Sequence, residues 1–339
     1  MTPPRVSVVL CVYNQAAYVA EAIVSILGQT LTDLELIIVD DGSTDSSPEV
    51  IHRFTDPRIR YVRNERNLGH AGSLNRGRAL ARGRYLAIMD SDDISLPERL
   101  ARQADFLDAH PDVAMCGSWV ETFGARTEVR RFPTEPAVLA VSMLLSCPFS
   151  TPTVMLRQAA TVPGGFDFDR FGLAFDYAYW VEVANRAPVA NLPEVLLKYR
   201  LHAGQTTVSR RAAQLAGTRL VLRRQLEALL GEVDEAELDA LMYVFVNEAS
   251  DEPPTAAIGS LFARLRRANR QRRRYDPAVL DALLAEKWAH IVTAHEPAVG
   301  AMWGQAVQHP ALWSWTLGRD AIRRTLRPFK PWFWKQRPA

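Results

Sequence analysis

The chain has 339 residues, of which 48% are hydrophobic and 23% charged, a composition typical of folded globular proteins and not of disordered ones. Its 40 basic and 38 acidic side chains give a net charge of +2, which excludes a nucleic-acid-binding protein that charge alone would identify. The near-neutral total hides an asymmetry. Residues 1–200 carry 20 basic and 24 acidic side chains, a net of −4, whereas residues 201–339 carry 20 and 14, a net of +6.

Residues 5–118 alternate short apolar runs with amphipathic stretches. The apolar runs are rich in β-branched residues and are predicted as strands: 6–12, 34–40, 58–64, 84–90 and 113–119. The stretches between them have apolar residues at helical spacing and are predicted as helices: 16–27, 46–54, 71–81 and 97–109. This alternation favours an α/β fold with a doubly wound, mostly parallel sheet. The alternating run 58–64 is expected near an edge of that sheet.

The pattern is mixed from residue 120 to about 205 and helical beyond it. The mixed part contains, in order, a helix, a loop rich in proline and threonine, a turn, a helix and a strand: 138–145, 147–153, 163–167, 175–186 and 194–202. The helical part is interrupted by Pro253-Pro254 and by Asp276-Pro277. The change in composition predicts an α/β domain, a helical domain and a C-terminal tail: 1–205, 206–318 and 319–339.

Polar side chains follow three of the predicted strands. Tyr13 and Asn14 come after the first strand, the sequence DDGSTD covers residues 40–45, and DSDD covers residues 90–93. Because the carboxyl ends of parallel strands meet at one edge of a sheet, we expect these side chains to lie close together. The turn at 40–45 could also serve only to cap the helix that follows it.

The segment DSDD gathers three carboxylates, Asp90, Asp92 and Asp93, around Ser91. Carboxylates at this spacing repel one another unless a cation is near. Mg²⁺ and Mn²⁺ prefer oxygen ligands and are commonly shared with the phosphates of a substrate. The segment therefore indicates a divalent metal site, or alternatively a solvated acidic turn before the next helix.

Two later segments add candidate side chains. Asp176 stands at a helix start between Phe175 and Tyr177, where it could act as a general base or only complement the helix dipole. Arg200 and His202 lie on one face of the last predicted strand. They could neutralise a diphosphate or complete a metal shell, or be surface residues of an ordinary edge strand.

Several well-known motifs are absent from the sequence. It contains no G-x-G-x-x-G, no G-x-x-x-x-G-K-[ST], no G-x-S-x-G and no H-E-x-x-H. This weakens the hypotheses of a dehydrogenase, a P-loop NTPase, a serine hydrolase and a zinc protease.

Seven blocks in order resemble the family 2 glycosyltransferases of the GT-A fold, over roughly residues 5–205. The blocks are VSVVLCVYNQAAYVAEAIVSILGQT, LELIIVDDGSTD, RNLG (66–69), RYLAIMDSDDISLPERL, GGFD, FDYAYW and LPEVLLKYRLH. The resemblance implies an inverting transfer of a sugar from a nucleoside-diphosphate sugar, by the family's habits a UDP-sugar, to a hydroxyl acceptor in polysaccharide, glycolipid or other surface-glycan synthesis. It implies a glycan or lipid-linked acceptor and no nucleic-acid partner.

The same resemblance implies roles for individual residues. Asp176 matches the catalytic base, and Tyr13 and Asp41 match the positions that recognise the nucleobase. Asp92 and His202 match positions that hold a divalent metal, Mn²⁺ or Mg²⁺. The remaining implied contacts to the nucleotide-sugar are Asn14, Asn67, Asp90, Ser91 and Arg200.

The chain departs from the family pattern at two positions. Phe175 stands where an acid usually precedes the base, and Gln205 stands where the family commonly has serine. The first departure keeps open an alternative function, a nucleotide-sugar-binding protein with little transfer activity. A sugar-phosphate nucleotidyltransferase is disfavoured, because those enzymes typically open with a glycine-rich, basic loop and CVYNQAAY is neither.

Cysteine usage and the C-terminal tail bear on location. There is no C-x-x-C spacing among Cys11, Cys116 and Cys147, which fits a reducing cytoplasm. The sequence also contains no run of about 18 apolar residues, so we predict no membrane-spanning helix. The tail 319–339 combines seven basic residues and one acidic residue with Phe329, Trp332, Phe333 and Trp334. Such a tail suits peripheral contact with the inner face of the cytoplasmic membrane, or packing on the helical domain or a second subunit.

Overall fold

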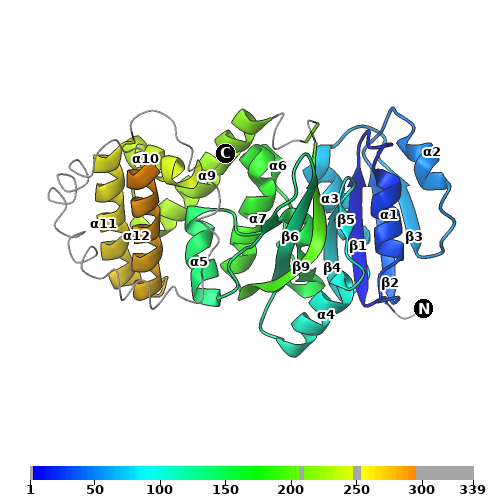
Figure 1. Cartoon of the computed structure of the whole chain (residues 1–339), viewed down its shortest axis with the longest axis horizontal. Coiled ribbons are helices and arrows are strands. Elements are labelled where there is room, and N and C mark those ends of the chain that lie inside the picture. Colours follow the sequence, from blue (N-terminus) through cyan, green and yellow to red (C-terminus); the bar gives the residue numbers. More distant parts are fainter. Residues whose placement is uncertain (1–2, 203, 206–209, 247–252, 295–339) are drawn as a thin grey trace. The chain divides into compact units, whose positions relative to one another are not determined.

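The computed structural model describes residues 3–202, 204–205, 210–246 and 253–294 (Figure 1). The predicted tail 319–339 and the end of the predicted helical domain lie outside the described residues. The described residues form two compact units, which we call the sheet unit (within 3–139 and 147–218) and the helical unit (within 140–146 and 219–294).

The first half of the sheet is parallel, as predicted. Its strands are β1 (Val6–Val12), β2 (Leu34–Asp40), β3 (Ile59–Arg63) and β4 (Tyr85–Asp90), in the order β3-β2-β1-β4, which places β3 at an edge. In the register of these strands Val12 lies opposite Asp40, and Cys11 lies opposite Asp90. The ends of β1, β2 and β4 are therefore level, so the residues that follow them meet at one edge of the sheet.

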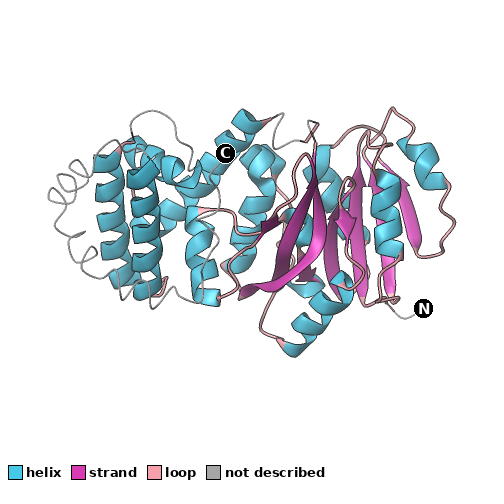
Figure 2. Ribbon diagram, viewed as in Figure 1, coloured by secondary structure: helices cyan, strands magenta, loops and turns pink. Residues whose placement is uncertain are grey.

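The second half of the sheet is mixed, with the order β4-β8-β6-β9-β5 and β7 paired to β6 (Figure 2). Its strands are β5 (Ile94–Ser95), β6 (Met115–Gly124), β7 (Val129–Arg130), β8 (Met155–Arg157) and β9 (Val189–Leu201). The short strand β8 is antiparallel to both β4 and β6, so the run 113–119 does not simply continue the parallel sheet. Strands of two or three residues show no periodicity, and the sequence pattern therefore does not reveal them.

The long strand β9 begins five residues before the predicted start at 194. Its pairing with β6 shifts register between Ser118 and Trp119, where Pro193 and Glu194 are passed over, and again between Trp119 and Val120. Proline has no backbone N–H to donate, so a bulge accommodates it within the strand. Beyond the bulge β9 stays paired with β6 up to Leu201, which places Arg200 and His202 at the end of this strand pair.

Helices cover both faces of the parallel strands. Those of the sheet unit are α1 (Val19–Leu27), α2 (Ser47–His52), α3 (Gly69–Leu80), α4 (Arg99–Ala109), α6 (Phe168–Phe171) and α7 (Phe175–Ala184), with α5 (Pro136–Leu145) shared between the two units. Leu10 and Ile38 pack in one cluster with Ile23 of α1. Val9 points to the opposite face, where a Cβ on Gly77 of α3 would lie 2.4 Å from Val9 Cγ1. The glycine thus lets α3 approach the sheet closely and fixes where the N-terminus of α3 lies.

Each fully buried aliphatic side chain of this core contributes about 1.5–3 kcal/mol relative to an exposed one. The strands β1 and β2 are buried almost throughout their length, as expected for strands covered on both faces. The strand ends are consequently held by a rigid core, which is the usual support for a site built on loops.

Helix α9 (Arg211–Leu230) begins in the sheet unit and continues in the helical unit from residue 219. The other helices of the helical unit are α10 (Glu235–Val246), α11 (Thr255–Arg272) and α12 (Pro277–Ala294). As predicted, prolines mark the breaks: Pro254 caps α11 and Pro277 begins α12. Among the helices of the described residues, we find none that is both long and apolar enough to cross a membrane.

Candidate functional site

The residues after β1 and β2 form one hydrogen-bonded structure. Asn14 has the left-handed φ of 53°, and its backbone N–H donates to Ser43 Oγ at 3.0 Å. The side-chain oxygen of Asn14 accepts from the backbone N–H of Thr44 at 2.8 Å. Tyr13 stays 47% exposed beside this structure. Asn14 therefore holds the turn 40–45 in place, and the ring of Tyr13 is available to a ligand.

The adjacent carboxylates Asp40 and Asp41 are buried but have different partners. Asp40 accepts from the backbone N–H of Ser43 at 2.8 Å and from the Tyr61 hydroxyl at 2.7 Å. Burial and this hydrogen bond raise the pKa of Tyr61 to about 12. Asp41 Oδ1 accepts from Asn64 Nδ2 and from the backbone N–H of Leu68, both at 2.7 Å. Within the described residues nothing donates to Asp41 Oδ2, which leaves one carboxylate oxygen for a ligand.

Residues 66–69 connect β3 to α3 beside Asp41. Asn67 is exposed, and its side-chain oxygen accepts from the backbone N–H of Gly69 at 3.0 Å. This local bond shapes the start of α3, while the amide group of Asn67 remains in solvent. His70, the first residue after this segment, lies beside the acidic cluster described next.

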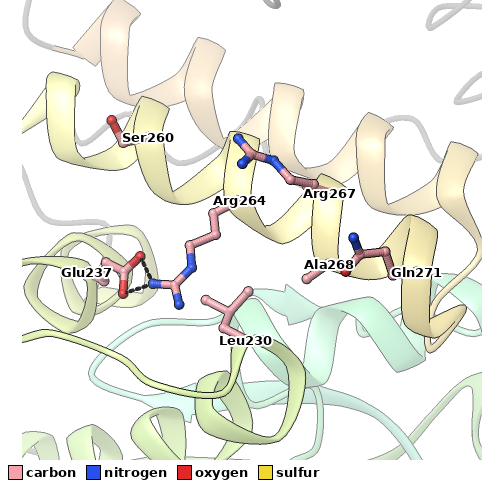
Figure 3. Close-up of a pocket in the computed structure, with 7 residues that line it drawn as sticks. All are labelled: Leu230, Glu237, Ser260, Arg264, Arg267, Ala268 and Gln271. Atoms are coloured by element: carbon pink, nitrogen blue, oxygen red, sulfur yellow. Dashed lines mark hydrogen bonds and ion pairs between the residues drawn. The ribbon is translucent and has the colours of Figure 1, made fainter.

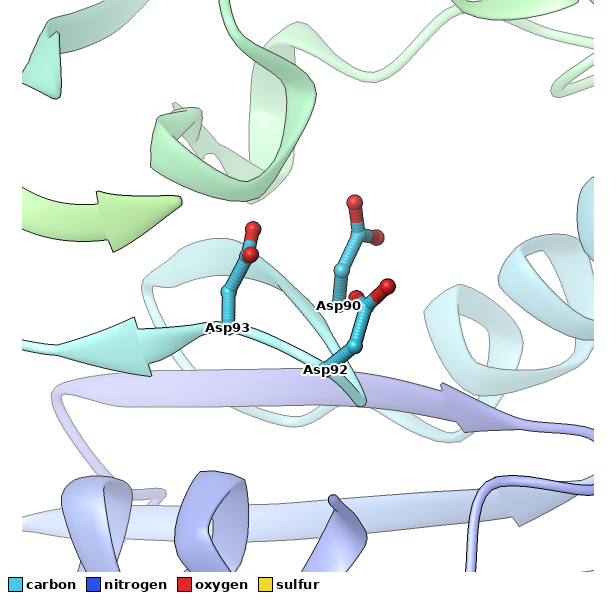
Figure 4. Close-up of side chains that lie close together, drawn as sticks. All are labelled: Asp90, Asp92 and Asp93. Atoms are coloured by element: carbon cyan, nitrogen blue, oxygen red, sulfur yellow. The ribbon is translucent and has the colours of Figure 1, made fainter. Parts of the chain in front are cut away.

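The cluster at the end of β4 consists of Asp90, Asp92 and Asp93, whose carboxylates point to the same side of the loop (Figure 4). Carboxylate oxygens from the three residues lie within 4.8 Å of one another. In the described part of the chain, the buried atoms Asp90 Oδ1 and Asp93 Oδ2 have no hydrogen-bond partner. Buried oxygens without a donor, gathered in this way, fit a divalent cation that prefers oxygen ligands. Ser91 is buried in the same turn.

The carboxyl groups of this cluster are strongly perturbed. Burial, with repulsion from Asp92 and Asp176, raises the pKa of Asp90 to about 8. Burial, with repulsion from Asp90 and Asp92, raises the pKa of Asp93 well above its usual range, even though Asp93 Oδ1 accepts from the backbone N–H of Arg200 at 2.8 Å. Carboxyl groups with strongly perturbed pKa values are typical of functional sites.

Arg200 and His202, more than a hundred residues later in the sequence, complete this cluster. Arg200 Nε donates to the backbone oxygen of Asp92 at 2.7 Å, and Nη2 donates to Glu21 at 2.9 Å. His202 Nε2 lies 2.9 Å from Asp92 Oδ2. The side chain of Gln205 accepts from the backbone N–H of His202 and donates to the backbone oxygen of Arg200. A glutamine at this position thus fixes the chain immediately after β9.

Asp176 is held in place from two sides at the start of α7. Its Oδ2 accepts from the Thr151 hydroxyl at 2.6 Å, and its Oδ1 accepts from the backbone N–H of Tyr177 at 2.7 Å. Asp176 is also close enough to contribute repulsion to the raised pKa of Asp90. The structure therefore brings the predicted base beside the predicted metal site. Sequence reasoning missed Thr151, for which the only signal is the threonine-rich loop 147–153.

His70 and Phe175 are further residues that the pattern did not assign to the site. His70 Nε2 lies 3.8 Å from Asp90 Oδ1. The His70 ring stands edge-on to Phe175, with ring centroids 5.6 Å apart. Phe175 itself is buried. The residue before Asp176 is therefore an aromatic packing residue, and a histidine placed directly after RNLG is the only sequence signal for this contact.

A pocket of about 360 Å³ lies in the helical unit (Figure 3). It is lined by Leu230, Glu237, Ser260, Arg264, Arg267, Ala268 and Gln271. Arg264 donates from Nη1 to both carboxylate oxygens of Glu237 and from Nη2 to the backbone oxygen of Glu232. None of the predicted site residues lines this pocket, and its acid is neutralised within the unit.

Comparison with known proteins gives consistent results. The family model described as Glycosyl transferase family 2 matches residues 7–161. An uncharacterized glycosyltransferase of Haemophilus influenzae is 33% identical over 218 residues, covering 60% of this chain and 68% of that protein. The Escherichia coli protein named UDP-Glc:alpha-D-GlcNAc-diphosphoundecaprenol beta-1,3-glucosyltransferase WfaP is 29% identical over 208 residues. The match covers 60% of this chain and 80% of that protein.

Solved structures share the fold. The crystal structure of Staphylococcus aureus TarS 1-349 in complex with UDP has a TM-score of 0.55 and 20% identity, covering 86% of this chain and 88% of that one. The mannosyltransferase PcManGT from Pyrobaculum calidifontis, in complex with GDP-Man and Mn²⁺, has a TM-score of 0.53 and 20% identity. The match covers 87% of this chain and 86% of that one.

Proposed function

Because this chain is a member of glycosyltransferase family 2 with the GT-A fold, we propose that it transfers a sugar from a nucleoside-diphosphate sugar to a hydroxyl acceptor, with inversion at the anomeric carbon. The observation that carries this proposal is the meeting of Asp176, held by Thr151, with the acidic cluster at the end of β4. An acid held for proton transfer beside a cation-binding cluster is what such a displacement requires.

The proposed donor is a UDP-sugar. Tyr13 offers an exposed ring, and Asp41 offers Oδ2 to an N–H of the base. The other proposed contacts to the nucleotide-sugar are Asn14, Asn67, Asp90, Ser91 and Arg200. UDP is supported by similar proteins, among them the Escherichia coli protein named as a UDP-Glc-dependent glucosyltransferase and the TarS structures in complex with UDP and UDP-GlcNAc.

Asp92 and His202 are the proposed ligands of a divalent metal, Mn²⁺ or Mg²⁺, with Asp90 and Asp93 supporting the site. The fit rests on the buried oxygens of Asp90 and Asp93 that lack donors among the described residues, and on the 2.9 Å approach of His202 to Asp92. When bound, the ion supplies Lewis-acid stabilisation of the negative charge on the departing diphosphate. The Arg200 guanidinium lies beside Asp92 and adds a fixed positive charge to this part of the site.

The proposed chemical step is a single displacement. The Asp176 carboxylate takes the proton of the acceptor hydroxyl, whose oxygen forms the new bond to the anomeric carbon. The bond from that carbon to the phosphate oxygen breaks, and its electron pair leaves with the nucleoside diphosphate. Thr151 and the Tyr177 N–H orient the two oxygens of Asp176 for the proton transfer.

The proposed acceptor is a saccharide of a surface polysaccharide, carried on a lipid. The names of two Escherichia coli relatives, WfaP and WfgD, specify GlcNAc-diphosphoundecaprenol as their acceptor. The basic, aromatic tail 319–339 is proposed to reach the membrane surface that carries such an acceptor. Deleting 319–339 should abolish co-sedimentation with anionic liposomes, and unchanged binding would contradict this role of the tail.

The test is release of nucleoside diphosphate from a panel of nucleotide-sugars with Mn²⁺. We expect release from a UDP-sugar, and a fall of about 10²–10⁴-fold in Asp176→Asn with donor binding retained, because general-base catalysis is lost. Asp169→Asn, an exposed acid on α6, is the matched control. Nucleotide-sugar binding without release in the wild-type protein would favour a binding protein instead, and a wild-type rate in Asp176→Asn would remove the base assignment.

A further inference from the structure

An aromatic group that includes the first residue of α6 surrounds Phe175, the residue before the proposed base. Phe168 begins α6 and is 47% exposed. Its ring centroid lies 6.5 Å from that of Phe175, the residue before Asp176. Phe175 is only 5% exposed and also contacts Phe166 edge-on, at 5.9 Å. One open ring is thus supported by a buried ring that belongs to the residue directly before Asp176 in the chain.

The exposure of Phe168 is unusual within this chain. Five large hydrophobic side chains are exposed among the described residues. Of these five, only Tyr13 and Phe168 are aromatic. A single exposed hydrophobic residue is by itself normal. Here both exposed rings accompany the site: Tyr13 follows β1 beside the turn 40–45, and Phe168 adjoins the residue before the base. Since Tyr13 already offers a ring to the nucleobase, Phe168 is left for another part of the substrates.

The aromatic group has a polar border. His70 packs edge-on against Phe175 at 5.6 Å, and its side chain is 41% exposed. His70 Nε2 faces Asp90 Oδ1 at 3.8 Å, which is too long for a direct hydrogen bond. Asp176, next to Phe175 in the chain, gives a second polar group. An apolar ring face bordered by a few polar groups is the usual design of a small-ligand site.

A pyranose ring has matching chemistry. Its C–H groups form an apolar face that packs on an aromatic ring, while its hydroxyl groups lie around the edge and hydrogen-bond to polar side chains. We propose that Phe168, supported by Phe175 and His70, forms the acceptor subsite and packs against the apolar face of the acceptor's terminal pyranose. This packing presents one hydroxyl of that sugar to Asp176. The inference rests on the proposed function, because it assigns the acceptor side of the same site.

The test is steady-state transfer from the active UDP-sugar to p-nitrophenyl glycosides, using the glycoside that the wild-type protein accepts best. Phe168→Ala should raise the acceptor KM about 3–10-fold, the range of an aromatic contact. The donor KM and the rate of donor hydrolysis without acceptor should stay unchanged. Phe168→Trp should keep the acceptor KM within about twofold, because it retains a flat ring. The matched control is Val24→Ala, because Val24 lies on α1 and is 59% exposed.

An unchanged acceptor KM in Phe168→Ala overturns the inference, and so does an increase confined to the donor KM. If the wild-type protein releases no nucleoside diphosphate, the proposed function fails, and the subsite is tested by binding alone. Saturation-transfer NMR with the same p-nitrophenyl glycosides then decides. Contact signals that weaken in Phe168→Ala and persist in Phe168→Trp support the subsite, and equal signals in all variants overturn it.

Discussion

The acidic cluster at the end of β4 and the acids of α10 are held in opposite ways. In the sheet unit, Asp90 and Asp93 each keep a buried oxygen without a donor among the described residues, and their pKa values are raised. In the helical unit the acids of α10 are paired with arginines: Glu235 with Arg219 and Arg223, Asp239 with Arg219, and Glu237 with Arg264. Burying a carboxylate without a partner costs several kcal/mol, whereas an exposed ion pair costs little.

The difference separates acids with a structural role from acids kept for a ligand. The free energy of unfolding of a typical folded protein is only about 5–15 kcal/mol. Buried acids without a partner therefore persist only where another role requires them. The arginines of the helical unit show that this chain has cations available to neutralise carboxylates. Among the described residues no arginine donates to the unpartnered oxygens of Asp90 and Asp93, which supports a bound cation as their partner.

The largest effect is expected at Asp92, the proposed metal ligand that also contacts His202. Asp92→Asn should lower the rate of nucleoside-diphosphate release by at least about 10²-fold, because it removes a proposed ligand of the metal that would stabilise the negative charge on the departing diphosphate. The release assay is run with saturating Mn²⁺. Asp105→Asn on α4, which breaks an ion pair to Arg5 on the surface, is the control and should keep the wild-type rate. A near-wild-type rate in Asp92→Asn would mean that the cluster does not serve the reaction.

The next effect concerns the way in which Asp176 is held. Thr151→Val removes the hydroxyl that donates to Asp176 Oδ2 at 2.6 Å and keeps the size of the side chain. A hydrogen bond to a charged group contributes about 1.5–3 kcal/mol, so kcat should fall about 10–100-fold. The donor KM should stay unchanged, because Thr151 acts through the base.

Thr151→Ser serves as the conservative variant and should recover most of kcat, since it keeps the hydroxyl group. Thr161→Val is the matched control, because its hydroxyl donates to the backbone oxygen of Gln158 and not to Asp176. If Thr151→Val changes the donor KM instead of kcat, Thr151 shapes the donor site and does not position the base.

The sequence predicted those features that repeat over many residues or stand at strand ends. The parallel strands could be read from continuous apolar runs, and the strand ends placed Asp41, Asp90 and Asp92 at one edge. The contact of His202 with Asp92 followed only from the family resemblance, since 110 residues separate the two. The contact of Thr151 with Asp176 could not be predicted, because it depends on how a loop with no periodic pattern folds against α7.

A smaller effect is expected for stability in the absence of metal. The pKa of Asp90 is about 8 in the folded protein, against an ordinary value of 3.8. Between these values the folded state keeps a proton that the unfolded state releases, so stability falls as the pH rises from about 4 to 8. Chelator-treated wild-type protein should therefore lose more thermal stability between pH 5 and pH 8 than Asp90→Asn does. One proton held by the folded state contributes about 1.4 kcal/mol per pH unit, so the added loss is about 3–5 °C for each pH unit, at about 2–4 °C per kcal/mol for a domain of this size.

Thermal unfolding at pH 5 and pH 8 with EDTA gives this comparison, and Asp112→Asn, an exposed acid, is the control. Adding Mn²⁺ at pH 8 should raise the wild-type Tm, because a ligand that binds the folded state stabilises it. Parallel pH curves for wild type and Asp90→Asn would show that the carboxyl of Asp90 is already compensated.

The smallest effect is expected in the helical unit, at Arg264. Its side chain is 38% exposed, and it pairs with Glu237, which is 15% exposed. Arg264→Gln should lower the free energy of unfolding by about 1 kcal/mol and the Tm by about 2–4 °C. The rate of transfer should stay unchanged. Adding Glu237→Gln should recover part of the loss, since it removes the acid left without a partner. Thermal unfolding and the release assay measure both results. A lower rate without a lower Tm would show instead that the arginines of this pocket belong to the working site, and the contrast between the two units would no longer hold.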